Sequence, residues 1–141
     1  GKIITFVSQK GGVATKRLNI KVADLDTQQG TFVEWNRIRL NNDYKTIGSV
    51  ETFATAKNAI KHADEYDLLI IDGTAHASSA TLEIATASDL IILPCCASRD
   101  DLVPSIRLAN ELQQKGISNK TIALALTRVT TQAEIEDAGE L

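Results

Sequence analysis

The chain has 141 residues, of which 43% are hydrophobic and 23% charged, and its formal net charge is −3. That length suits one domain with a full hydrophobic core, and the charge excludes binding of polyanions by bulk attraction, although not a local basic face. No apolar run approaches the roughly 20 residues of a membrane span, and no signal peptide is visible. Composition therefore favours a cytoplasmic globular protein with no membrane span.

Five short apolar runs follow one another along the chain, at 3–7, 20–26, 67–73, 89–96 and 121–129. The runs at 67–73 and 89–96 are continuous rather than alternating, which is typical of strands buried on both faces of a parallel sheet. Helical spacing predicts helices between the runs, over 31–39, 51–65, 77–87 and 99–115. Alternating strands and helices predict an α/β domain of three layers, with a mostly parallel sheet and helices on both faces.

The segment after the first predicted strand, SQKGGV at residues 8–13, has the composition of a phosphate-binding loop. Gly11 and Gly12 allow backbone N–H groups to approach a phosphate, and Lys10 precedes them. On its own the Lys-Gly-Gly triplet is a weak signal, because glycines after a strand often form only a turn.

Carboxylates end two further predicted strands. Asp24 and Asp26 close the second strand, and Asp72 closes the third. Ligands of parallel α/β sheets bind at the carboxyl ends of the strands, and acidic side chains beside a glycine loop suit a magnesium ion and an attacking water. The three segments together predict a Mg²⁺–nucleotide site, a stronger inference than any one of them supports.

Four segments carry a resemblance that spans nearly the whole chain: GKIITFVSQKGGV at 1–13, VADLDTQQGTFVEW at 22–35, YDLLIIDGTA at 66–75 and ASDLIILPCCASRDDL at 87–102. In that order they resemble the ParA/MinD family of deviant Walker A P-loop ATPases, and most closely the ParA branch that segregates plasmids and chromosomes. The resemblance implies one P-loop ATPase domain over residues 1–141, with ATP and Mg²⁺ as cofactors.

The resemblance also implies roles for the phosphate loop. Lys10 is similar to the signature lysine that reaches the partner subunit's phosphates in an ATP-bound homodimer. Gly11, Gly12 and Val13 are similar to the backbone that cradles the nucleotide.

For the acidic residues, the resemblance implies that Asp26 positions the hydrolytic water and that Asp24 supports it. It implies that Asp72 holds Mg²⁺ through water, so that Asp24, Asp26 and Asp72 make up the expected metal site.

The function implied is that of a ParA-type ATPase. ATP-bound dimers would bind DNA nonspecifically, and a centromere-binding ParB-like partner would stimulate hydrolysis in the cytoplasm at the nucleoid. Two alternatives stay open: a MinD-like ATPase that cycles on membranes, and a metabolic enzyme of the same fold, such as an amide-forming synthetase or an iron–sulfur reductase. The reductase needs separated cysteines, and Cys95 and Cys96 are adjacent.

The loop departs from the family pattern at the positions where the family has a lysine for the phosphates and a hydroxyl residue for Mg²⁺. After KGGV the family has glycine, lysine and a hydroxyl residue, whereas this chain has Ala14, Thr15 and Lys16. After the loop, about five residues remain before the second strand, or ~8 Å of helix, against a strand about 20 Å long. Either the protein has lost nucleotide binding, or a segment is missing near 13–18. We expect the second, with a chain break there, and we also expect a missing C-terminal part.

His62, Trp35 and His76 are expected to have no catalytic role. Thr127–Arg128 stands where many relatives have an adenine-reading asparagine, which leaves base selectivity open. We expect His62 to be solvated and Trp35 to pack on the helix after the second motif. His76 follows the third strand but is not expected to be catalytic.

Overall fold

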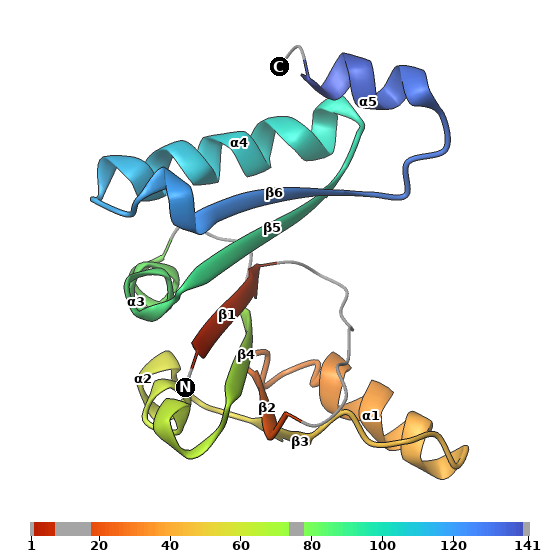
Figure 1. The fold of residues 1–141 in the computed structure, drawn as a ribbon, viewed down its shortest axis with the longest axis vertical. Helices are drawn as coiled ribbons and strands as arrows, with labels where there is room; N and C mark the ends of the chain where they lie inside the picture. The colour runs from red at the N-terminus through yellow and green to blue at the C-terminus, as the bar shows by residue number, and fades with distance from the viewer. Residues whose placement is uncertain (1, 8–17, 74–77, 140–141) are drawn as a thin grey trace.

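The computed structural model describes residues 2–7, 18–73 and 78–139 (Figure 1). Its six strands form one sheet in the order β3-β2-β4-β1-β5-β6, and every neighbouring pair is parallel. The strands are β1 (Lys2–Val7), β2 (Ile20–Asp24), β3 (Ser49–Thr52), β4 (Leu68–Gly73), β5 (Leu90–Cys96) and β6 (Ile122–Thr127).

Five α-helices and two short 3₁₀ helices accompany the strands in the described part of the chain. They are α1 (Thr31–Asn41), α2 (Ala56–Ile60), α3 (Ser79–Ala87), α4 (Arg99–Gln114) and α5 (Gln132–Gly139), with η1 (Ala63–Glu65) and η2 (Asn119–Thr121). None of the helices described is both long and apolar enough to cross a bilayer. The predicted α/β class with helices on both faces of a parallel sheet is confirmed.

The two faces of the sheet are covered by different helices. The first face, which carries Leu69 on β4 and Ile91 on β5, packs against α2, α3 and α4. The second face, which carries Ile20 and Val22 on β2, packs against Phe32 of α1. The alternation of side chains along each strand separates the two cores.

The predicted helix over 51–65 is wrong in its first third. Residues up to Thr52 belong to β3, an edge strand that the apolar pattern did not indicate, and α2 and η1 follow it. The strand is held by polar contacts: Lys21, which is 4% exposed, donates to Ser49 Oγ at 3.1 Å and forms an ion pair with Glu51. An edge strand of polar residues escapes a search for hydrophobic runs.

Gly48, immediately before β3, allows the chain to pass close to β2. A Cβ atom at Gly48 would lie 2.3 Å from the backbone oxygen of Ile20, and the residue has φ +147°. Gly48→Ala should therefore lower the free energy of unfolding by about 2–3 kcal/mol, measured by urea denaturation. The control is Gly116→Ala, where φ is +92° but nothing lies within 4 Å of the added atom. Equal losses of stability in both variants would show that the close approach of residue 48 to Ile20 does not contribute to the effect of Gly48→Ala.

Candidate functional site

Asp24 and Asp72 lie side by side at the carboxyl end of the sheet. They are register partners on the neighbouring strands β2 and β4. On the other side of β4, Asp72 is the partner of Phe6 in β1. The end of β1, where the glycine loop begins, is therefore next to the carboxylates, as the sequence predicts.

Asp24 holds the start of helix α1. Its side chain is 1% exposed, and its two oxygens accept hydrogen bonds from different backbone N–H groups: Oδ1 from Asp26 at 2.9 Å and Oδ2 from Phe32 at 3.1 Å. The N-cap residue, Gly30, has no side chain with which to cap the helix. Asp24 supplies that cap from the preceding strand, so its role is to position Asp26 and α1.

Asp26 occupies the turn between β2 and α1. Its Oδ1 accepts from the N–H groups of Gln28 at 3.2 Å and Gln29 at 3.0 Å, and its backbone oxygen accepts from Gly30 at 2.8 Å. Among the described residues no hydrogen bond to Oδ2 is found, and the side chain is partly exposed. The hydrogen bonds to Oδ1 therefore fix the orientation of the Asp26 carboxylate within the turn.

Asp72 carries the clearest electrostatic signal in this region. Burial, followed by the negative charges of Asp24 and Asp26, raises its pKa from 3.8 to about 7. Its backbone oxygen accepts from Leu25 N at 3.1 Å, which ties the ends of β2 and β4 together. Burial and the two neighbouring negative charges favour the protonated form of Asp72, and a bound cation would favour its ionised form instead.

The donors at this edge suit Mg²⁺, which prefers hard oxygen ligands and retains several waters. In the part of the chain that the structure describes, no cluster of three or more His, Cys, Asp or Glu side chains could hold a metal ion directly. Asp24 has both oxygens engaged. The arrangement therefore fits an ion held by Asp72 through water and completed by a ligand's phosphates, as the resemblance implies, better than an ion bound by three carboxylates.

Some predicted residues lie outside the described ranges. They are Lys10, Gly11, Gly12 and Val13 of the loop, and His76 after β4. The predicted chain break near 13–18 also falls almost wholly there, so it stays a prediction.

At the far side of the carboxyl edge, Thr127 ends β6 and donates from Oγ1 to the backbone oxygen of Cys95 at 3.2 Å. Arg128 follows with φ 55°. Cys95 is buried and Cys96 partly exposed, both as free thiols, and burial raises the pKa of Cys95. The cysteines point to opposite faces of β5, as expected.

Two residues with predicted structural roles make specific contacts. Trp35, 37% exposed, packs against Phe32 with ring centroids 5.3 Å apart. His62 is more packed than expected: its Nδ1 lies 3.0 Å from Glu65 Oε1 and its ring contacts Phe53.

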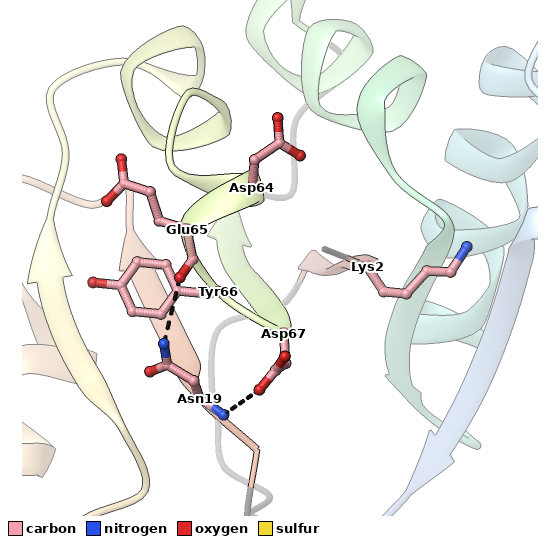
Figure 2. Close-up of a pocket in the computed structure, with 6 residues that line it drawn as sticks. All are labelled: Lys2, Asn19, Asp64, Glu65, Tyr66 and Asp67. Carbon is pink, nitrogen blue, oxygen red and sulfur yellow. Dashed lines mark hydrogen bonds between the residues drawn. The ribbon is translucent and has the colours of Figure 1, made fainter.

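A hollow of about 590 Å³ opens at the opposite, amino-terminal edge of the sheet (Figure 2). It is lined by Lys2, Asn19, Asp64, Glu65, Tyr66 and Asp67. There Asn19 donates from its backbone N to Asp67 Oδ2 at 2.8 Å and from Nδ2 to the backbone oxygen of Glu65 at 3.4 Å. These contacts fix the start of β2, and the acidic lining disfavours a phosphate, so the carboxyl edge is the better candidate site.

Solved structures with the same fold include plasmid partition and cell-division proteins. A putative plasmid partition protein from Borrelia burgdorferi bound to AMPPNP is 20% identical, with a TM-score of 0.65 over 99% of this chain and 79% of its own. The MinC:MinD complex of Aquifex aeolicus is 12% identical, with a TM-score of 0.71 over 99% and 77%. The pNOB8 ParA bound to nonspecific DNA is 17% identical, with a TM-score of 0.61 over 99% and 73%.

No protein-family profile matches the sequence, and no curated protein does. At these identities the likeness establishes the fold, which this chain shares with ParA/MinD-type ATPases.

Proposed function

We propose that the chain is the ATPase domain of a ParA-type partition protein. In this proposal it binds ATP with Mg²⁺, dimerises on binding, and associates with DNA without sequence preference at the nucleoid. A centromere-binding ParB-like partner would stimulate hydrolysis. The observation that carries the proposal is the meeting of Asp24, Asp26 and Asp72 beside the end of β1, with the pKa of Asp72 raised to about 7.

Each carboxylate has a distinct part in this proposal. Asp26, fixed in its turn, orients the attacking water, and Asp24 holds that turn against α1. Asp72 holds Mg²⁺ through water, and the ion, when bound, neutralises charge on the phosphates. Gly11, Gly12 and Val13 cradle the phosphates.

Lys10 completes the proposed site across the dimer by contacting the partner's nucleotide. The sequence has Ala14, Thr15 and Lys16 where a lysine and a hydroxyl residue are needed for the β- and γ-phosphates and Mg²⁺. The ATPase proposal therefore concerns the protein with a complete loop.

Asp26→Ala tests the catalytic role. A carboxylate that orients water contributes more in the transition state than in the ground state, so turnover should fall about 100-fold or more while AMPPNP affinity stays within about threefold. The measurements are steady-state ATP hydrolysis and AMPPNP titration of the full-length protein. Glu83→Ala, an exposed carboxylate on α3, is the control and should keep full turnover. Normal turnover in Asp26→Ala would remove Asp26 from the site.

A MinD-like membrane-cycling ATPase is the second candidate, favoured by the structural likeness to MinD in the MinC:MinD complex. The two candidates differ in the surface that the ATP-bound dimer binds. Cosedimentation with ATP should recover the protein with plasmid DNA, and this should weaken steeply with salt. Recovery with anionic liposomes but not with DNA would favour the MinD-like alternative.

A further inference from the structure

Helix α1 and the loop after it present a surface of exposed aromatic and aliphatic side chains around one arginine. Trp35, Ile38 and Arg39 are spaced i, i+3 and i+4, so they share one stripe of the helix, and Tyr44 in the loop contacts Arg39. The α1 patch consists of these four residues. Trp35, Ile38 and Tyr44 are 37%, 50% and 61% exposed. Exposed apolar side chains that gather in one place mark interaction surfaces.

Arg39, at the centre of the α1 patch, is held in one orientation. Its guanidinium carbon lies 5.5 Å from the ring centroid of Trp35 and 5.4 Å from that of Tyr44. Its Nε donates to the backbone oxygen of Lys45 at 3.0 Å, and Tyr44 N donates to the backbone oxygen of Arg39 at 3.2 Å. Because these contacts already order the side chain, a ligand of the guanidinium would cost little further conformational entropy.

The charge of Arg39 is not paired within the described part of the chain. The ion pairs found there do not include Arg39, and Asp43 in the same loop does not contact it. Its two Nη groups have no hydrogen-bond acceptor among the described residues, because Nε makes the hydrogen bond to Lys45. Residues 8–17 and 74–77 contain no acidic side chain, so they could not supply a carboxylate.

Arg37, on the same helix, shows what a guanidinium edge of this kind binds. It donates from Nε to Glu34 Oε2 at 2.8 Å and from Nη2 to Glu34 Oε1 at 2.6 Å, which makes a bidentate pair within α1. Residues two positions apart on a helix do not face each other, so Glu34 serves Arg37 and not Arg39. A carboxylate for Arg39 must therefore come from another molecule.

The surroundings of Arg39 favour a protein segment over a nucleic acid. Nucleic acids are held by several cations along their phosphates, whereas here one unpaired guanidinium lies near the opposite charges of Asp43 and Lys45, in a chain of net charge −3. The rings of Trp35 and Tyr44 already contact the guanidinium, so they are less available to stack on bases. Tryptophan, tyrosine and arginine are the residues enriched at the hot spots of protein interfaces.

We propose that the α1 patch docks a partner protein through a short segment in which one aspartate or glutamate is bordered by apolar residues. The carboxylate pairs with the two Nη groups of Arg39, and the apolar residues cover Ile38 and the exposed part of Trp35. Figure 1 shows α1 beside β2 and β3, at the side of the sheet away from β5. Arg39 lies about 10 Å along the helix from Phe32, the residue that Asp24 binds, so the docking does not rest on the proposed function.

The first experiment selects ligands for the α1 patch without assuming their sequence. Short random peptides displayed on phage are selected on the chain, and their affinities are measured by the fluorescence of Trp35, the single tryptophan. We expect the enriched peptides to share an acidic residue beside apolar ones and to bind Arg39→Ala about tenfold more weakly or worse. A selection that enriches no peptide, or peptides without an acidic residue, would overturn the proposal.

Arg37→Ala is the matched control, because its guanidinium is already paired with Glu34. It should keep the affinity of the selected peptides within about twofold of the parent. Arg39→Lys retains the charge but not the bidentate geometry, so it should recover only part of the affinity that Arg39→Ala loses. Equal affinity in Arg39→Lys and the parent would contradict the pairing with both Nη groups.

The second experiment changes the peptide, so that it cannot disturb the fold of the protein. In a selected peptide the aspartate or glutamate is replaced by its amide. The parent chain should bind the amide peptide about tenfold less tightly, because a charged hydrogen-bonded pair becomes a neutral one. Unchanged affinity would show that apolar contact alone holds the peptide, and would contradict the role of Arg39.

Two other occupants of the α1 patch give different results. A dimer of the parent chain that Arg39→Ala dissociates, measured by sedimentation velocity, would assign the patch to a second copy. Duplex DNA that changes the fluorescence of Trp35 in the parent but not in Arg39→Ala, with a steep dependence on salt, would assign it to nucleic acid. Either result would overturn the proposal. Peptide binding is measured without nucleotide, so an inactive ATPase would contradict the proposed function alone.

Discussion

Asp24→Ala should cost about 3 kcal/mol of the free energy of unfolding, a large share of the ~5–15 kcal/mol that stabilises a domain. The buried carboxylate accepts hydrogen bonds from the backbone of Asp26 and Phe32. Alanine would leave both N–H groups without these acceptors at the start of α1, and hydrogen bonds to a charged group are the stronger kind. Urea denaturation followed by the fluorescence of Trp35, the single tryptophan, measures the loss on α1 itself.

Asp26→Ala is the matched control, two residues away. Its carboxylate also accepts two backbone hydrogen bonds, but the donors are at exposed Gln28 and Gln29, which water can satisfy instead. We expect a loss below about 1 kcal/mol. If the two variants lose the same stability, Asp24 is not the cap of α1, and the distinction between a positioning and a catalytic aspartate fails.

The placement of the carboxylates could be predicted because it depends only on strand order and direction. Asp24 and Asp72 end apolar runs, and parallel strands bring their carboxyl ends to one edge. Asp24 and Asp72 are adjacent because β2 and β4 are neighbouring strands of the sheet. The elevated pKa of Asp72 could not be predicted, because it depends on burial and on the distances among three charges.

Strand β3 and the cap of α1 could not be predicted from hydrophobic periodicity, because both depend on tertiary contacts. Strand β3 has a single apolar residue, Val50, and is held by the buried Lys21. The cap of α1 comes from Asp24, outside the usual N-cap position, because Gly30 at that position has no side chain. Both features depend on contacts within the assembled sheet.

The departure at the phosphate loop stays a prediction from the sequence. The motif shows that Ala14 to Lys16 depart from a phosphate loop. A segment missing near 13–18 would explain that departure, and this window falls almost wholly outside the described residues.

Asp72→Asn should stabilise the nucleotide-free chain at pH 8 and have little effect at pH 4. The folded pKa of Asp72, about 7, lies above its ordinary value of 3.8, so between these values the folded state binds a proton that the unfolded chain has released. The stability contributed by the protonated carboxyl is complete below pH ~4 and is lost as the pH rises through about 7. The full shift would correspond to ~4 kcal/mol, and solvent screening of this partly buried group reduces the expected gain to about 2 kcal/mol.

Mg²⁺ should reverse the order of stability of the parent and Asp72→Asn at pH 8. That reversal would identify the carboxylate of Asp72 as part of a cation site. At pH 8 the ionised Asp72 destabilises the fold because burial removes water from the carboxylate and because the negative charges of Asp24 and Asp26 lie nearby. A divalent cation, added with AMPPNP to the full-length protein, offsets that repulsion in the parent but loses its carboxylate in Asp72→Asn. Melting temperatures at pH 8 should therefore rise with ligand in the parent and stay unchanged in the variant, with Glu83→Gln behaving as the parent. An equal rise in Asp72→Asn would show that the charge at Asp72 does not contribute to ion binding.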